Sequence, residues 1–215
     1  MTARTTAVAQ YLAADVFRSQ RILIPLFLYT IVIGLLLSDN PGPPPGVWPV
    51  TALALYPTAT WLALIVANTE DPAQRIVTTI AAGGPGRLAA GTLFVALAAD
   101  TVLIALSVTV SALRATGSYP PQALLSGALV HIAAATTGTA VGLLCARPLV
   151  TRVGWSFVIA VSVVTITSVQ SWLPPVGSAV RALTTGGPAP VAQALLGLAL
   201  AGAAAIIAGA VDKTR

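Results

Sequence analysis

Residues 88–113, LAAGTLFVALAADTVLIALSVTVSAL, carry one ionisable side chain, Asp100, within an otherwise apolar run. A helix needs about 20 predominantly apolar residues to cross a hydrocarbon core of roughly 30 Å, so this run is long enough to span a bilayer. The composition of the chain agrees with that environment, since 56% of its 215 residues are hydrophobic and only 8% are charged. An ordinary soluble domain carries about 25% charged residues. The sequence therefore predicts that lipid surrounds most of this chain.

Five more apolar runs are separated by short polar or Pro/Gly-rich segments. We therefore expect an all-α integral membrane fold in a single domain, residues 1–215, with six transmembrane helices. The expected spans are residues 22–37, 48–67, 88–113, 123–146, 154–169 and 191–210.

Basic residues predict how the bundle is oriented. Short cytoplasmic loops are enriched in Lys and Arg, and this bias sets membrane topology. With both termini in the cytoplasm, nine basic residues lie inside and only Arg114 and Arg181 lie outside. The nine are Arg4, Arg18, Arg21, Arg75, Arg87, Arg147, Arg152, Lys213 and Arg215. We expect a multi-pass protein of the bacterial inner membrane with cytoplasmic N- and C-termini, and we attribute the net charge of +5 to this asymmetry rather than to nucleic-acid binding.

Residues 1–21 precede the first span and show a weak amphipathic pattern. Val8, Tyr11, Leu12 and Val16 recur near helical spacing, whereas polar residues fall between them. Such a pattern is typical of a helix that lies in the plane of the membrane interface. A partly ordered tail is the alternative.

The loop after the second span, NTEDPAQRIVTTIAAGGPGR at residues 68–87, carries signals for a second amphipathic helix. Asp71 is a candidate N-cap, Pro72 suits the first helical position, and Gln74 completes a pattern similar to a capping box. The glycines at residues 83–86 end the helix. Its apolar stripe consists of Ala73, Ile76, Val77, Ile80 and Ala81.

These features together resemble the type V ABC exporter permeases, in particular small members from actinobacteria. The resemblance rests on FRSQR at 17–21, NTEDPAQR at 68–75, AAGGPGR at 81–87, the six-span order and the Pro174–Pro175 pair. It implies that Asp71 to Ala82 is a coupling helix that docks on a separate ATP-binding subunit. The implied contact residues are Glu70, Asp71, Pro72, Arg75, Ile76 and Ile80. A surface helix that contacts only lipid is the alternative.

The ATP site is expected on the partner subunit. No stretch of the chain matches G-x-x-x-x-G-K-[ST], and its only lysine is Lys213, so a P-loop cannot be built from these residues. The resemblance implies two permease subunits, identical or related, with two ATP-binding subunits that bind ATP and Mg. We expect no cofactor and no metal ion in this chain itself.

Polar residues within the spans suggest where a pathway and a buried contact would lie. In the resembling family the second and fifth spans line the pathway, which here points to Tyr56, Thr58, Trp61, Ser162 and Thr165. These two spans hold no charge, so an apolar or amphiphilic cargo is expected.

Asp100 and His131 lie at similar predicted depths, and we expect them to pair, either as a structural hydrogen bond or as a functional site.

Two other segments have expected roles. Gly138 and Gly142 form a G-x-x-x-G pattern in the fourth span, which predicts close helix packing. Residues 176–183, in the outer loop after Pro174–Pro175, are expected to form a short helix, with a solvated loop as the alternative.

Three other functional classes compete with a permease. Six acidic residues and one histidine, spread along the chain, do not provide the clustered groups of a membrane enzyme. A secondary transporter usually shows internal repeats around charged midplane sites, and no such repeat is evident. A membrane scaffold or immunity-type protein that transports nothing is the strongest alternative, because no single motif in this chain requires transport.

Overall fold

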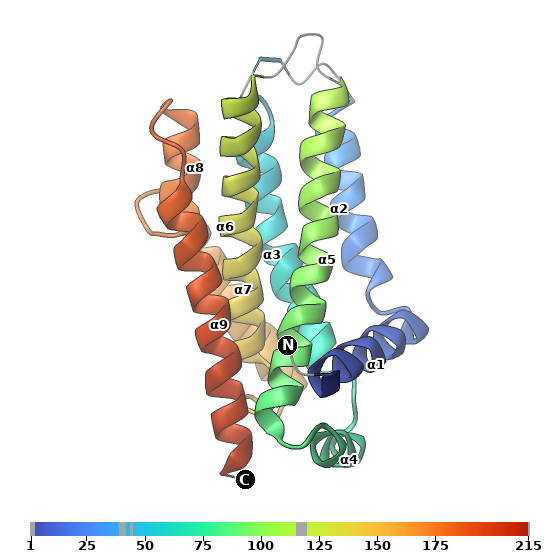
Figure 1. The fold of residues 1–215 in the computed structure, drawn as a ribbon. Coiled ribbons are helices and arrows are strands. Elements are labelled where there is room, and N and C mark those ends of the chain that lie inside the picture. The colour runs from blue at the N-terminus through green and yellow to red at the C-terminus, as the bar shows by residue number, and fades with distance from the viewer. Residues whose placement is uncertain (1–2, 39–41, 44, 115–119, 215) are drawn as a thin grey trace.

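The computed structural model of the protein describes residues 3–38, 42–43, 45–114 and 120–214. These residues form an all-helical bundle, shown in Figure 1. Its helices are α1 (Ala3–Ser19), α2 (Leu23–Leu36), α3 (Trp48–Ala67), α4 (Pro72–Ala82), α5 (Pro85–Arg114), α6 (Pro121–Cys145), α7 (Val153–Val169), α8 (Val176–Thr184) and α9 (Val191–Lys213).

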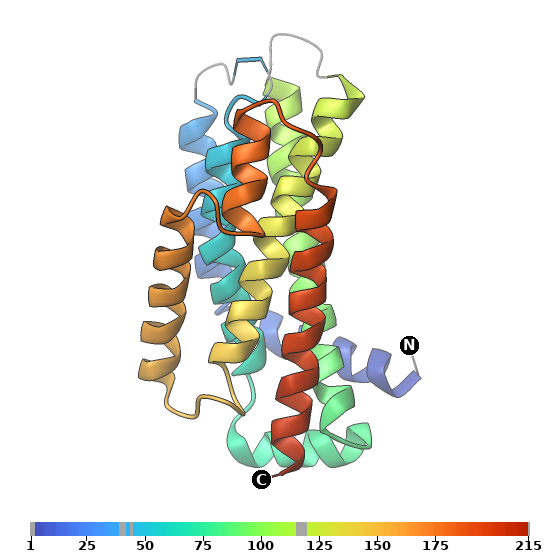
Figure 2. The ribbon, with the colours of Figure 1, turned by 90° about the vertical axis from the view of Figure 1, so that its left-hand side faces the viewer.

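Helices α3 and α6 form the centre of the bundle. α6 buries 14 of its 25 residues and α3 buries 12 of its 20, whereas α7 buries only three of 17. Figures 1 and 2 show α2, α3, α5, α6 and α9 running side by side along the bundle, with α7 at its edge. α4 lies across one end of the bundle, which we call the α4 end, and the C-terminus is at the same end. α7 therefore presents most of its apolar surface to the surroundings.

Four helices, α3, α5, α6 and α9, are long and apolar enough to cross a membrane. α1 and α2 add a fifth candidate if they are counted as one span, although they meet at a bend of 75°. α7 has 17 residues, about 26 Å of helix, which is shorter than a hydrocarbon core of about 30 Å. In Figure 2, α8 lies further toward the other end of the bundle than α7. The architecture is that of a multi-pass membrane protein, and within the described residues four helices, or five with the bent pair, are candidate spans by length and composition.

The G-x-x-x-G pattern of α6 lies against α3, as the sequence predicts. A Cβ atom added at Gly138 would meet the Tyr56 carbonyl oxygen at 2.5 Å, and one at Gly142 would meet the Thr60 carbonyl oxygen at 2.6 Å. Both glycines therefore allow the two backbones to approach closely.

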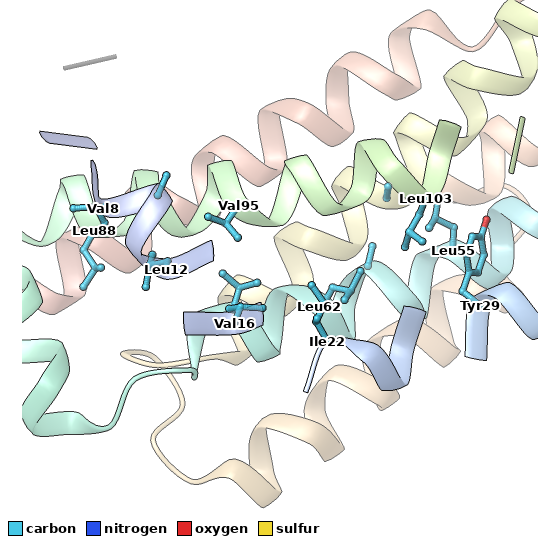
Figure 3. Close-up of a cluster of buried hydrophobic side chains, with 14 of the residues drawn as sticks. Val8, Leu12, Val16, Ile22, Tyr29, Leu55, Leu62, Leu88, Val95 and Leu103 are labelled. Carbon is cyan, nitrogen blue, oxygen red and sulfur yellow. The ribbon is translucent and has the colours of Figure 1, made fainter. Parts of the chain in front are cut away.

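The helix expected within residues 1–21 is present as α1, and it lies against α5. Val8, Leu12 and Val16 are buried in a cluster with Leu88 and Val95, as Figure 3 shows. The sharp bend between α1 and α2 turns α1 across the bundle. The amphipathic pattern of the N-terminus thus corresponds to a packed helix.

The outer loop after α7 contains the short helix α8, which matches the expected range to within one residue. Val176, Gly177 and Ala179 are buried, and two of them belong to a cluster with Tyr56 of α3 and Val130 of α6. This segment is therefore packed against the bundle and is not a solvated loop.

Candidate functional site: the α4 end of the bundle

Local sequence determines both ends of α4. The Asp71 carboxylate accepts a hydrogen bond from the Gln74 backbone N–H at 2.8 Å, and Pro72 occupies the first helical turn. At the other end, Gly83 adopts the left-handed conformation with φ of 79°, and its N–H donates to the Ile80 carbonyl. These caps satisfy backbone groups that a helix end leaves unpaired. α4 is therefore a short helix with two fixed ends.

The apolar stripe of α4 points away from the bundle. Ile76, Val77 and Ile80 have exposed fractions of 62%, 67% and 75%, although they are large apolar side chains. The buried residue of this helix is Ala82, which lies about 160° around the helix axis from Ile80. We call Ile76, Val77 and Ile80 the outward stripe.

Polar contacts hold the opposite face of α4 against neighbouring helices. The Arg75 guanidinium lies 3.4 Å from the Asp212 carboxylate near the end of α9. The Gln74 side-chain amide donates to the Tyr11 hydroxyl on α1. The amphipathic helix is thus inverted relative to a packed surface helix, with its polar side toward the protein and its apolar side outward.

A third contact fixes the start of α4. The Thr78 hydroxyl donates to the Glu70 carboxylate, and Glu70 is only 5% exposed. Near the far end, the Arg87 guanidinium donates to the Ala82 and Gly83 carbonyls at 3.2 and 3.1 Å. A cation is favourable at these carbonyls because the C-terminus of a helix carries partial negative charge.

Two hollows flank α4 and make it a ridge. One, of about 380 Å³, lies between α4 and α1 and is lined by Val77, Tyr11 and Arg4, among others. The other, of about 640 Å³, lies between α4 and the segment that joins α6 to α7. Ile76 and Ile80 line this second hollow on one side, and Arg147 lines it on the other. α4 therefore stands as a ridge between two hollows at this end of the bundle.

The residues expected to contact a partner divide into two groups. Asp71, Pro72, Ile76 and Ile80 are exposed on the ridge. Glu70 and Arg75 instead bond to Thr78 and Asp212, so they position α4 within this chain. No local sequence signal predicts the contacts with Asp212 and Tyr11, because both residues are far from α4 along the chain.

The residues expected to line a pathway are only partly brought together. Trp61 and Thr165 line a hollow of about 240 Å³ between α3 and α7. Tyr56 is buried and shares a hydrogen bond of 3.0 Å with the Thr167 hydroxyl, and Thr58 donates to the carbonyl of its own helix at Ala54. Neither Tyr56 nor Thr58 lines this hollow, and Ser162 is exposed elsewhere on α7.

The expected pair of Asp100 and His131 is not formed, and the prediction was wrong. The Asp100 carboxylate accepts a hydrogen bond of 2.6 Å from the Thr139 hydroxyl, and its other oxygen is buried without a partner among the described residues. His131 bonds elsewhere. Asp100 lies about 10 Å along α5 from Ser107, the residue that faces His131. Asp100 and His131 therefore lie about two helical turns apart along the bundle, so the expectation that they share a depth was wrong.

His131 is the centre of a buried polar cluster that joins four helices, α2, α3, α5 and α6. Its Nδ1 lies 2.7 Å from the Gly127 carbonyl oxygen, so Nδ1 carries the proton and Nε2 is an acceptor. Nε2 lies 2.9 Å from the Thr51 hydroxyl of α3 and 3.0 Å from the Ser107 hydroxyl of α5. The Tyr29 hydroxyl of α2 donates to the Thr51 carbonyl at 3.1 Å. This cluster holds the helices together through buried hydrogen bonds.

Neither the α4 end nor the His131 cluster gathers several metal-binding side chains among the described residues. The described residues contain no group of three His, Cys, Asp or Glu side chains arranged to hold a metal ion. No protein-family model, curated protein or solved structure matches this chain.

Proposed function

We propose that the chain is the transmembrane permease subunit of an ABC exporter, with α4 as the helix that docks on a separate ATP-binding subunit. The observation that carries the proposal is the direction of the outward stripe. Ile76, Val77 and Ile80 are exposed on the side of α4 opposite to its contacts with the bundle. A contiguous exposed apolar surface bordered by polar residues is typical of a protein or membrane interaction site.

The direction of the stripe favours a protein partner over lipid. Lipid surrounds the flanks of a transmembrane bundle, so a helix that rests on lipid turns its apolar side toward the membrane. α4 lies across the end of the bundle in Figures 1 and 2, and it turns its polar side toward the bundle. The outward stripe would then face away from the membrane, where a subunit in the cytoplasm would cover it.

The contacts of α4 suit the transmission of movement. Its two caps fix a short helix, and its polar side is tied to α1 through Tyr11 and to α9 through Asp212. Movement of a partner bound to the outward stripe would therefore reach two helices at once. Arg147 in the adjoining hollow would favour an acidic side chain on the partner.

In the complete exporter each permease would supply half of a pathway, as a homodimer or with a related chain. The apolar hollow between α3 and α7, lined by Trp61 and Thr165, suits an apolar or amphiphilic cargo. Both termini would lie in the cytoplasm, and α2 and α7 would also cross the bacterial inner membrane, which makes six spans in all. ATP and Mg would bind to the partner subunit.

The double variant Ile76→Asp/Ile80→Asp tests the docking surface. Buried apolar anchors dominate interface energies and often contribute about 2 kcal/mol or more each, so loss of copurification with the ATP-binding subunit is expected. The control, Ile76→Val/Ile80→Val, keeps the stripe apolar and should copurify normally. Both variants should insert into the membrane to the same extent as the wild type. Normal binding of the partner by the aspartate variant would refute the docking role of α4.

A further inference from the structure

A second feature of the structure is an apolar groove in the angle between α1 and α5. It has a volume of about 340 Å³ and is separate from the hollows that flank α4. Ala9, Ala13 and Phe17 of α1 form one wall, and Phe94, Ala98 and Val102 of α5 form the other. The exposed fractions of Phe17, Phe94 and Val102 are 67%, 49% and 64%, so large apolar side chains border an open groove.

The shape of the groove follows from residue size. Alanines at positions 9, 13 and 98 line it where larger side chains would fill it, and the two phenylalanines border it. From Phe94 to Val102 the wall rises about 12 Å along α5. The result is an open apolar groove along a candidate membrane-spanning helix, which suits an extended hydrocarbon chain.

The position of the groove places it at a membrane boundary. α5 is one of the four helices able to span the bilayer, and α1 crosses it where Val8 and Leu12 pack near Leu88. The 75° bend that separates α1 from α2 leaves α1 lying across the bundle, while α5 continues upward past α1 in Figure 1. The groove therefore begins at the level of an interfacial helix and extends toward the bilayer core.

Two arginines adjoin one end of the groove. Arg18 follows Phe17 and Arg21 precedes Ile22, and both Phe17 and Ile22 line the groove. Both arginines are exposed, and neither forms a hydrogen bond or an ion pair with the described part of the chain through its guanidinium. Asp15 is the only acidic residue within 3–21, against three arginines, so this segment has a net charge of +2. Two exposed arginines thus lie next in sequence to groove-lining residues and add positive charge to this segment.

We propose that the groove binds one anionic phospholipid, with an acyl chain between α1 and α5 and its phosphate near Arg18 and Arg21. Guanidinium groups bind phosphate oxygens well because they present several fixed donors. Each basic residue near a membrane surface contributes about a fivefold preference for anionic lipid, so two contribute about 25-fold. This inference depends on the membrane location of the bundle and is independent of the exporter proposal.

Native mass spectrometry of the purified full chain in detergent tests the site. The probes are palmitoyl-oleoyl phosphatidylglycerol and palmitoyl-oleoyl phosphatidylcholine, added in equal amounts. We expect the wild type to retain one phosphatidylglycerol with about a 25-fold preference over phosphatidylcholine. Ala13→Phe/Ala98→Phe, which fills the groove, should reduce retention of both lipids at least tenfold. Its control, Ala14→Phe/Ala105→Phe, makes the same change at exposed positions of the same helices outside the groove and should retain lipid normally.

Charge variants test the headgroup contact without altering a buried residue. Arg18→Gln/Arg21→Gln should retain lipid but lose the preference for phosphatidylglycerol. Arg152→Gln/Lys213→Gln removes two exposed charges elsewhere on the expected cytoplasmic side and should keep it. If both charge variants lost the preference for phosphatidylglycerol equally, the preference would come from the general surface charge, and the assignment of the headgroup to Arg18 and Arg21 would be overturned. Normal lipid retention by the Ala13→Phe/Ala98→Phe variant would overturn the lipid site. So would a wild-type chain that is dimeric when the same variant is monomeric, because the groove would then be a dimer contact.

Discussion

Replacing Gly138 with alanine should destabilise the bundle, because the backbone of α3 fills the space that the new methyl group needs. The added Cβ would lie 2.5 Å from the Tyr56 carbonyl oxygen, 2.9 Å from the Ala59 Cβ and 3.0 Å from the Thr60 nitrogen. Ordinary contact begins at 3.4 Å, so α3 and α6 would have to separate locally by about 0.9 Å. Overpacking of this kind typically costs about 1–3 kcal/mol.

Gly202 in α9 provides the matched control. A Cβ at this position meets no atom within 4 Å, yet Gly202 also lies inside a long apolar helix. Alanine favours helix over glycine by about 1 kcal/mol, and this gain applies to both variants and cancels in their comparison. Unfolding by titration with a denaturing detergent in mixed micelles should therefore give Gly138→Ala a stability about 1–3 kcal/mol below that of Gly202→Ala. Equal stability of the two variants would refute the close packing of α3 on α6.

Two further predictions concern the buried carboxylate and the topology. Thr139→Val removes the hydroxyl that donates to the Asp100 carboxylate. Because this leaves a buried polar group unpaired, the free energy of unfolding should fall by about 1–3 kcal/mol. Thr139→Ser keeps the hydroxyl and should unfold with the free energy of the wild type. An unchanged stability of the valine variant would contradict the contact. Reporter fusions after Gly84 and Lys213 should report the cytoplasm, and one after Gly186 should report the outside, because nine of eleven basic residues then lie inside. A reporter after Gly186 that is cytoplasmic would exclude the proposed six-span topology.

Local sequence signals predicted the short elements well. The cap at Asp71, the proline at position 72 and the left-handed Gly83 act within α4 itself, so the sequence was sufficient to predict this helix. The limits of α3 match the expected span at both ends. Span number was harder to predict, because the apolar runs at 22–37 and 154–169 are short and the helices formed there, α2 and α7, have 14 and 17 residues.

Contacts between residues far apart along the chain could not be predicted from local sequence signals. The direction of the outward stripe depends on Tyr11 and Asp212, which lie on helices far from α4 along the chain. The partner of Asp100 depends on the register of α5 against α6. In that register Ser107 faces His131, and Asp100 faces Thr139. Antiparallel helices joined by a short connection have a limited choice of register, so the short segment between α5 and α6 was the available signal.

The most direct test of the account is purification of the tagged wild-type chain from the membranes of its own organism under mild detergent. We predict that it carries an ATP-binding subunit with a P-loop, in equal numbers of the two subunits, and that the complex hydrolyses Mg-ATP. The same preparation from the Ile76→Asp/Ile80→Asp variant should contain the permease alone. A wild-type chain that purifies intact without any P-loop protein would contradict the exporter account and favour a membrane scaffold.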